Sequence, residues 1–502
     1  MGAPWEPASP AGIGDWPHRR RVKSAGVPAL IFGEADLTYD ALAARVDRLA
    51  NALHDRGVRE GDRVAYLGNN HPAFVETLFG VTLLGAILVP LNTRLSVPEL
   101  AYMLRDSSAR SLFFAGDLEE RARAAAREAG GVDVVAVEGA GPDGMAALTS
   151  AGARTHPPCH ATLDDPALII YTSGTTGRPK GAVLTHGNLT WNAFNVLVDY
   201  DVTSEGRALM ISPLFHVASL GMGLLPVLLK GGTVVLAERF LPGEALRLIE
   251  RHRITSLSGV PTTYQLLMED PAWARTDLSS LRSLTCGGSA VPARVRQAYE
   301  ARGLAFSSGY GLTETSPGAT SLSPRYSVTK GETSGLPHFF TDVRVEPESG
   351  EVEVRGPNVF AGYWENPEAT QAAFTDGGWL RTGDLGRLDD EGFLTIVDRA
   401  KDLIVSGGEN VYPAEVELAI MTFPDVTGVA VIGVPDERWG EVPHAVLTLR
   451  PGATLVQAEF VDYLSQRLAR YKVPRTFEVV DELPRTASGK LQKHLLRRAR
   501  RQ

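Results

Sequence analysis

The stretch at residues 171–181 combines the residue types that a polyphosphate needs around it. It reads Tyr-Thr-Ser-Gly-Thr-Thr-Gly-Arg-Pro-Lys-Gly, and the apolar run before it, residues 167–170, predicts a strand that ends in this loop. Glycines let backbone N–H groups approach a ligand, the Ser and Thr hydroxyls donate hydrogen bonds, and Lys180 adds a compensating charge. The spacing of Gly174 and Lys180 differs from that of the usual P-loop. On composition alone, a flexible Gly/Thr linker is an equally good interpretation.

A second stretch, at residues 309–315, places a carboxylate beside a tyrosine that is flanked by glycines. Its sequence, Gly-Tyr-Gly-Leu-Thr-Glu-Thr, allows Tyr310 to lie against an adenine ring, while Thr313 and Glu314 supply oxygens. A carboxylate next to a triphosphate requires a bridging cation, and Mg²⁺ prefers carboxylate and phosphate oxygens together with water. The stretch therefore indicates an ATP and Mg²⁺ site. The alternative is a glycine turn before a helix.

Further strings follow in an order that is typical of one family. They are Pro-Leu-Phe-His at 213–216, Tyr363-Trp364 with Arg-Thr-Gly-Asp at 381–384, Asp-Arg-Ala-Lys-Asp-Leu-Ile at 398–404, and Pro-Arg-Thr-Ala-Ser-Gly-Lys at 484–490. With the first two stretches, they resemble the adenylate-forming superfamily over nearly the whole chain. That superfamily includes acyl-CoA synthetases, aryl-CoA ligases, peptide-synthetase adenylation domains and firefly luciferase. Within it, the chain most resembles bacterial fatty-acyl-CoA synthetases and feruloyl-CoA synthetases. The resemblance implies an acid–thiol ligase that uses ATP, Mg²⁺ and coenzyme A.

The resemblance also implies a role for individual residues. Glu314 would bind Mg²⁺, Asp384 and Arg399 would hold the ribose, and the catalytic residues would be Lys490, Glu314, Thr172 and His216. The nucleotide and CoA contacts that it implies are Thr172, Ser173, Gly174, Thr175, Thr176, Gly177, Lys180, Gly288, Ser289, Gly309, Tyr310, Gly311, Thr313, Asp384, Arg399, Lys401, Gly408 and Trp439. Of these, Gly408 and Trp439 would lie near the CoA channel, and the backbone at Lys401 would turn the C-terminal domain between the two reaction steps.

The acid pocket that the same resemblance implies is walled by small and apolar residues. Its members are His216, Ala218, Met222, Gly287, Gly288, Gly309 and Gly318. Adenylation domains for amino acids carry Asp where this chain has His216. Because an unpaired ammonium group in a pocket is costly, an amino acid substrate is disfavoured. Small walls leave room for a long or aromatic acid rather than acetate. Some of these glycines could equally serve tight turns.

We therefore expect a ligase that adenylates a carboxylic acid, releases pyrophosphate and passes the acyl group to the thiol of CoA. The acid is expected to be a medium- or long-chain fatty acid or a hydroxycinnamate such as ferulate, and the strings at 184–192 and 339–342 favour the latter. Three alternatives stay open: a stand-alone enzyme that loads a carrier protein, a luciferase-like oxygenase, and an inactive nucleotide-binding sensor. Intact Lys180, Glu314, Asp384, Arg399 and Lys490 argue against a sensor.

The elements that must position these residues follow from apolar periodicity. A stripe of Leu42, Val46, Leu49 and Leu53 predicts a helix that Thr38 can cap at its N-terminus. Residues 63–67 then read as a buried strand, and a further helix starts after Pro72. We expect a loose tail over the first dozen residues and regular structure from about Leu37 onward.

The recurring alternation of helix and strand predicts an α/β fold. We expect a large N-terminal region of layered α/β sheets with a β-rich subdomain, followed by a small mobile α+β C-terminal domain. The predicted boundary separates an AMP-binding domain, residues 1–398, from a C-terminal domain, residues 399–502.

Composition limits the partners and the cellular location that we expect for the protein. The 502-residue chain carries a formal net charge of −9, which gives no electrostatic reason to expect nucleic acid as a partner. Its two cysteines, Cys159 and Cys286, are too few for a disulfide framework. No secretory signal or membrane span is predicted. We expect a cytoplasmic monomer or homodimer without integral membrane association, whose partners are the acid, ATP and CoA.

Overall fold

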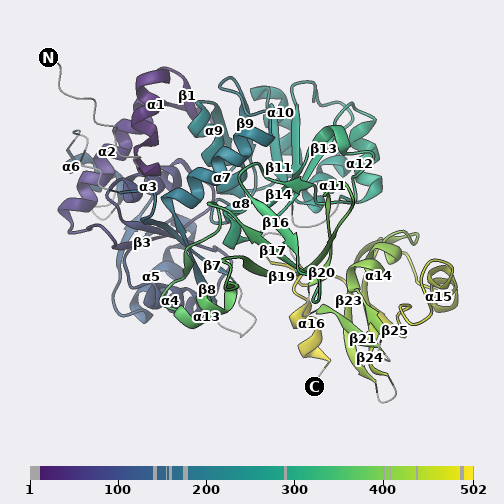
Figure 1. Ribbon diagram of the computed structural model, residues 1–502. Coiled ribbons are helices and arrows are strands. Elements are labelled where there is room, and N and C mark those ends of the chain that lie inside the picture. The colour runs from purple at the N-terminus through teal and green to yellow at the C-terminus, as the bar shows by residue number, and fades with distance from the viewer. Residues whose placement is uncertain are drawn as a thin grey trace. The chain divides into compact units, whose positions relative to one another are not determined.

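Figure 1 shows the computed structural model, which describes residues 12–139, 144–153, 155, 157, 161–172, 179–287, 291–399, 402–406, 409–436, 439–486 and 491–500. The chain forms two compact units. The first comprises Met1–Val343 and Val354–Leu380, and the second comprises Arg344–Glu353 and Arg381–Gln502.

A nine-stranded sheet, in the order β15-β14-β13-β12-β11-β9-β10-β1-β2, forms one layer of the first unit. Its strands are β15 (Leu336–Pro337), β14 (Thr320–Leu322), β13 (Phe306–Tyr310), β12 (Ser283–Cys286), β11 (Ser256–Gly259), β9 (Arg207–Met210), β10 (Thr233–Leu236), β1 (Pro28–Phe32) and β2 (Ala35–Thr38). The strands from β13 to β1 pair in parallel, and β2, β14 and β15 add antiparallel edges.

A seven-stranded sheet, in the order β18-β8-β7-β4-β3-β5-β6, forms a second layer. Its strands are β18 (Gly362–Tyr363), β8 (Lys180–Thr185), β7 (Pro166–Thr172), β4 (Ile87–Leu91), β3 (Arg63–Leu67), β5 (Ala109–Phe114) and β6 (Asp133–Ala136). Strands β7, β4, β3, β5 and β6 are parallel, whereas β8 and β18 run antiparallel to their neighbours.

Helices cover both sheets. Those of the first unit are α1 (Trp16–Ser24), α2 (Tyr39–Asp55), α3 (Pro72–Leu83), α4 (Val97–Asp106), α5 (Glu119–Glu128), α6 (Met145–Ala151), α7 (His186–Asp199), α8 (Val217–Ser219), α9 (Leu225–Lys230), α10 (Pro242–His252), α11 (Pro261–Glu269), α12 (Ala293–Glu300) and α13 (Pro367–Ala373). Short 3-10 turns are η1 (Ile13–Asp15), η2 (Gly116–Leu118), η4 (Thr313–Thr315) and η5 (Pro324–Tyr326), and η3 (Leu220–Leu224) is a π-helix.

The layers follow from the alternation of side chains along buried strands. In β3, Val64 and Tyr66 pack into a central core with α2 and α3, whereas Ala65 and Leu67 pack into a second core with α4 and α5. The nine-stranded sheet divides its residues in the same way between the central core and a third core with α10, α11 and α12. Where both faces of a strand are buried, as in β3, β4 and β10, the strand is almost wholly apolar. The predicted α/β fold class is confirmed (Figure 1).

The N-terminal part of the chain shows what periodicity could and could not predict. The helix predicted after Thr38 is α2, and the Thr38 hydroxyl accepts a hydrogen bond from the Ala41 amide at 3.2 Å. The expected start of regular structure near Leu37 is wrong, because η1, α1 and β1 precede it. Helix α1 is rich in arginine and carries no clear apolar stripe, although Trp16 is buried.

The second unit carries most of a four-stranded sheet in the order β16-β17-β19-β20 and all of a five-stranded sheet. The first has strands β16 (Asp342–Val345), β17 (Glu351–Arg355), β19 (Leu380–Leu388) and β20 (Leu394–Arg399); the second has β21 (Ile404–Ser406), β22 (Glu409–Val411), β23 (Val426–Asp436), β24 (Gly440–Leu449) and β25 (Thr476–Val479). Helices α14 (Pro413–Ile420) and α15 (Gln457–Ser465) pack on the five-stranded sheet, and α16 (Lys493–Ala499) follows. Among the helices that the structure describes, none has the length and apolar character to cross a membrane.

We expect Leu49→Ala to lower the free energy of unfolding of the first unit by about 2–5 kcal/mol, because the fully buried side chain leaves a cavity in the central core. Calorimetric unfolding of the full chain measures the loss. His54→Ala, on the exposed face of the same helix, is the matched control. Equal unfolding temperatures for both variants would contradict the central core described above.

Candidate nucleotide and acid site

The phosphate-loop stretch connects two paired strands. Thr172 ends β7, Lys180 begins β8, and the two residues lie opposite each other in the antiparallel pair. The Thr172 hydroxyl comes within 3.5 Å of the Lys180 carbonyl oxygen. At the end of β7, the Tyr171 hydroxyl donates to the Asp106 carboxylate at 2.6 Å, which ties the strand to α4. The sheet thus fixes both ends of the loop. The strand before the loop, β7, is the one that the apolar run at residues 167–170 predicted.

Glu314 is held close to this loop by a tyrosine from a distant part of the chain. The Tyr363 hydroxyl donates to Glu314 Oε1 at 2.9 Å, and burial together with the Glu314 carboxylate raises the pKa of Tyr363. The Lys180 ammonium nitrogen lies 5.2 Å from the centre of the Tyr363 ring. Backbone contacts fix the arrangement, since Tyr363 pairs with Ala182 of β8 and the Phe360 amide donates to the Glu314 carbonyl at 2.9 Å.

This arrangement brings together Thr172, Lys180, Glu314 and Tyr363, which we call the phosphate-end cluster. Its first three members were predicted from the sequence, whereas Tyr363 was identified only as part of a motif and was given no role. A phenol that fixes one carboxylate oxygen leaves the carboxylate further acceptor capacity.

The phosphate-end cluster suits Mg²⁺ bound mainly by a nucleotide. Among the described residues, no group of three or more His, Cys, Asp or Glu side chains lies together so that the protein alone could hold a metal ion. Mg²⁺ commonly takes one or two carboxylates, several waters and the oxygens of a bound phosphate chain. A single oriented carboxylate, Glu314, fits that pattern, and the ammonium group of Lys180 lies over the ring of the tyrosine that orients it.

The glycines of the predicted nucleotide and acid sites differ in what surrounds them. A Cβ atom on Gly311 would lie 1.6 Å from the Pro317 carbonyl oxygen, and one on Gly309 would lie 2.8 Å from the Thr320 carbonyl oxygen. At Gly318 it would lie 2.8 Å from His338 Nε2. Close packing of the chain therefore requires glycine at these three positions. A Cβ on Gly287 would meet nothing within 4 Å, so open space adjoins the chain there.

His216 stands at the N-cap position of the short helix α8. Its Nε2 atom is buried without a hydrogen-bond partner among the described residues, and its ring lies 4.7 Å from that of Phe215. Burial, reinforced by the positive charge of Arg94, lowers the pKa of His216 to about 4. The imidazole is therefore neutral at physiological pH. Ala218 is exposed in the same helix, and Met222 is half-buried in the π-helix η3.

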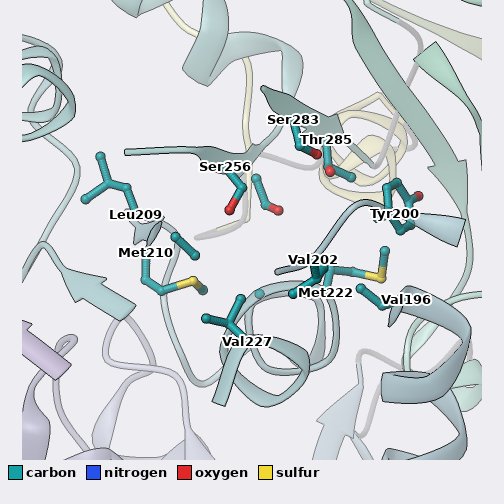
Figure 2. A pocket seen from close by; sticks show the side chains of 13 residues that line it. Val196, Tyr200, Val202, Leu209, Met210, Met222, Val227, Ser256, Ser283 and Thr285 are labelled. Atoms are coloured by element: carbon teal, nitrogen blue, oxygen red, sulfur yellow. The ribbon is translucent and has the colours of Figure 1, made fainter. Parts of the chain in front are cut away.

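A small cavity adjoins this part of the predicted acid pocket. It has a volume of about 30 Å³, and Met222 and Gly223 of η3 line it together with Tyr200 and residues of strands β9, β11 and β12 (Figure 2). The cavity lies wholly within the first unit.

Two residues predicted to hold the ribose lie side by side in the second unit. Asp384 in β19 and Arg399 in β20 are direct partners across the two antiparallel strands, and Asp384 is buried. The Trp439 amide donates to the Asp436 carboxylate at 2.9 Å, and the guanidinium group of Arg475 lies 5.3 Å from the centre of the Trp439 indole. The remaining predicted residues lie outside the described residues: Ser173, Gly174, Thr175, Thr176, Gly177, Gly288, Ser289, Lys401, Gly408 and Lys490.

Comparison with known proteins decides the family. Residues 18–364 match the AMP-binding enzyme family, and residues 415–490 match the AMP-binding enzyme C-terminal domain. The chain belongs to the AMP-binding enzymes. This finding confirms the superfamily predicted from the motifs.

Relatives of this AMP-binding enzyme match along its whole length. A feruloyl-CoA synthase from an Amycolatopsis species is 49% identical over 97% of this chain and 99% of its own. The long-chain-fatty-acid–CoA ligase FadD13 from Mycobacterium tuberculosis is 37% identical over 97% of this chain and 98% of its own. The solved structure of O-succinylbenzoate coenzyme A synthetase from Bacillus subtilis, in complex with ATP and magnesium ion, has a TM-score of 0.87 at 35% identity and covers 97% of this chain and 99% of its own.

We expect Glu314→Gln and Tyr363→Phe each to weaken Mg²⁺-dependent ATP binding about tenfold or more, because the first removes the metal-binding charge and the second its orienting hydrogen bond. Titration calorimetry with ATP, in the presence and absence of Mg²⁺, measures the change. Glu332→Gln, at an exposed carboxylate of the same unit, is the control. If both variants bind Mg-ATP as the unmodified chain does, the phosphate-end cluster is not the metal site.

Proposed function

We propose that this AMP-binding enzyme, an ATP-dependent acyl-CoA ligase, acts on aryl acids of the hydroxycinnamate type, such as ferulate. The observation that carries the choice of acid is the 49% identity to a feruloyl-CoA synthase along almost the full length of both chains. The predicted class of reaction, with ATP, Mg²⁺ and CoA as the predicted participants, is confirmed by relatives of this kind. A fatty acid is the second candidate, supported by the similarity to FadD13 at 37% identity.

The first step that we propose joins two negatively charged groups. A carboxylate oxygen of the acid must attack the α-phosphate of ATP, where like charges repel. Lys180 and the loop after Thr172 would hold the phosphates, and Glu314, oriented by Tyr363, would hold Mg²⁺. When bound, Mg²⁺ supplies positive charge beside the phosphate oxygens. Lys490 would neutralise charge that develops as pyrophosphate leaves.

The second step needs no covalent link to the enzyme. With AMP as the leaving group, the thiol of CoA attacks the acyl carbon of the adenylate directly. Asp384 and Arg399 would keep the ribose in place, and neutral His216 would border the acid near its carboxylate without adding a charge. Gly408 and Trp439 would line the path of the CoA arm. Cys286, which is fully buried and whose pKa burial raises, has no part in this chemistry.

We further propose that residues 1–398 act as the AMP-binding domain and residues 399–502 as a domain that turns about Lys401 between the two steps. We propose that the protein is cytoplasmic and that it acts as a monomer or a homodimer. The phosphate-end cluster supports an active enzyme over a nucleotide sensor, because a sensor has no need of an oriented metal carboxylate. A stand-alone enzyme that loads a carrier protein differs from a CoA ligase in the thiol that accepts the acyl group, and this can be tested directly.

The choice of substrate is tested with a panel of acids. We expect CoA-dependent release of AMP to be fastest with ferulate and 4-hydroxycinnamate and slower with medium- and long-chain fatty acids. Free amino acids should release none, because position 216 carries a histidine and no carboxylate to pair with their ammonium group. Reactions without CoA and with a carrier protein in its place are the controls. A preference for acetate or for an amino acid would refute the proposal.

Lys490 should serve only the first step. We expect Lys490→Ala to lose about 100-fold or more of its CoA-thioester formation from acid and ATP, the loss typical of removing one group that stabilises developing charge. When the variant is given synthetic acyl-adenylate and CoA, substantial thioester formation should remain. Lys493→Ala, a lysine of the same C-terminal segment that pairs with Glu417, is the control. Equal losses in the two assays would contradict a role limited to adenylation.

A further inference from the structure

Strands β11 and β12 carry a row of hydroxyl groups on one face of the nine-stranded sheet. In their parallel pairing, Ser256 lies opposite Ser283 and Ser258 lies opposite Thr285. The residues between them, Leu257 and Leu284, point to the other face and pack into the core with α10, α11 and α12. One face of these two strands is therefore apolar and the other is lined by hydroxyls. We call Ser256, Ser258, Ser283 and Thr285 the hydroxyl row.

The hydroxyl row lines the 30 Å³ cavity beside the predicted acid pocket. Figure 2 shows Ser256, Ser283 and Thr285 of this row gathered on one side of the cavity and Met210, Met222 and Val227 on the other. No hydroxyl of the row makes a hydrogen bond to another described residue. The cavity is thus polar on one side only, and its polar side carries hydroxyl groups that have no protein partner in the described part of the chain.

Two further hydroxyls lie next to the row. Ser307 of β13 pairs with Thr285 and is fully buried, and Tyr200 lines the cavity and is almost fully buried. Neither hydroxyl has a hydrogen-bond partner of normal geometry among the described residues. Burial raises the pKa of Tyr200, while Ser321 lies close enough to lower it by a weak side-chain hydrogen bond, and the Ser321 hydroxyl also lies 3.5 Å from the Asp199 carboxylate. Because buried hydroxyls are nearly always paired, these groups indicate a bound molecule or water.

The cavity adjoins two predicted walls of the acid pocket. Met222, a predicted wall of that pocket, lines it, and the Tyr200 hydroxyl lies 3.6 Å from the point where a Cβ atom of Gly309 would stand. Gly309 is another predicted wall. A substrate whose carboxylate lies near the nucleotide would therefore present its opposite end to Tyr200 and to the hydroxyl row.

We propose that Tyr200 and the hydroxyl row bind the ring hydroxyl of an aryl acid, so that the ligase selects phenolic acids over acids with a wholly apolar end. This inference rests on the proposed function. A cavity of 30 Å³ has room for a group the size of one or two water molecules, such as a hydroxyl or a methoxy group, but not for a long alkyl chain. An apolar end placed there would leave several hydroxyls without partners, which a site built to hydrogen-bond its substrate penalises strongly.

The test compares two acids that differ by one hydroxyl group, 4-hydroxycinnamate and cinnamate. The full chain is assayed with ATP, Mg²⁺ and CoA, and the ratio of the two kcat/KM values is the readout. Tyr200→Phe and Thr285→Val each remove one hydroxyl, and the second variant serves if the first fails to fold. Tyr264→Phe is the matched control, because its single hydroxyl proton is shared between the carbonyl oxygens of Leu257 (2.9 Å) and Thr285 (2.7 Å) in the same two strands, and it does not line the cavity.

We expect the unmodified chain to prefer 4-hydroxycinnamate about tenfold or more, the range of a lost hydrogen bond to a buried group. Each of the two variants should reduce this ratio severalfold, and Tyr264→Phe should keep it. Equal kcat/KM values for the two acids, or ratios that neither variant changes, would overturn the inference and leave the cavity to water alone. If the unmodified chain forms thioester from neither acid, the proposed function fails and the inference fails with it.

Discussion

Gly362 and Tyr363 add a two-residue antiparallel strand to the edge of the seven-stranded sheet, beside β8. The pairing carries Tyr363 to Lys180, and the neighbouring amide of Phe360 binds the carbonyl of Glu314. Three segments that are far apart in the chain meet through these few backbone contacts. Because the sheet itself is buried on both faces, its edge is a rigid place to hold the two ends of the loop, Thr172 and Lys180. The hydrogen bond that orients the Glu314 carboxylate depends on this edge.

The charges of the first unit are distributed in keeping with the reaction. The phosphate-end cluster carries the oppositely charged groups Lys180 and Glu314, and in the proposed reaction the substrates would bring most of their charge there. The acid end holds a neutral imidazole at His216 and, further in, only hydroxyls and apolar side chains. A pocket of this kind can recognise a polar but uncharged group, and a second carboxylate or an ammonium group on the acid would find no charged partner among these residues.

The sequence predicted the parts that have a long periodic signal or a distinctive string. The stripe of α2 and the apolar strand β3 follow from spacing alone, and the motif at 171–181 indicated a phosphate loop at a strand end. Helix α1 was missed because its buried residues, Trp16, Pro17 and His18, are consecutive and form no helical stripe. The role of Tyr363 could not be predicted, since a two-residue strand has no periodicity. The alternating Ser256 and Ser258 are visible in the sequence, but their partners depend on the register of two strands, which the fold sets.

The π-helix at Leu220–Leu224 carries a consequence for how such pockets diversify. A π-turn holds one residue more than an α-turn. This one lies between α8 and α9, and its Met222 lines the cavity. Loss of a single codon there would restore regular helical geometry and rotate the wall residue by about 100° around the helix axis. The nucleotide-binding strands would be untouched. A lineage could thus exchange one acid for another through a short deletion, without passing through a form that no longer binds ATP.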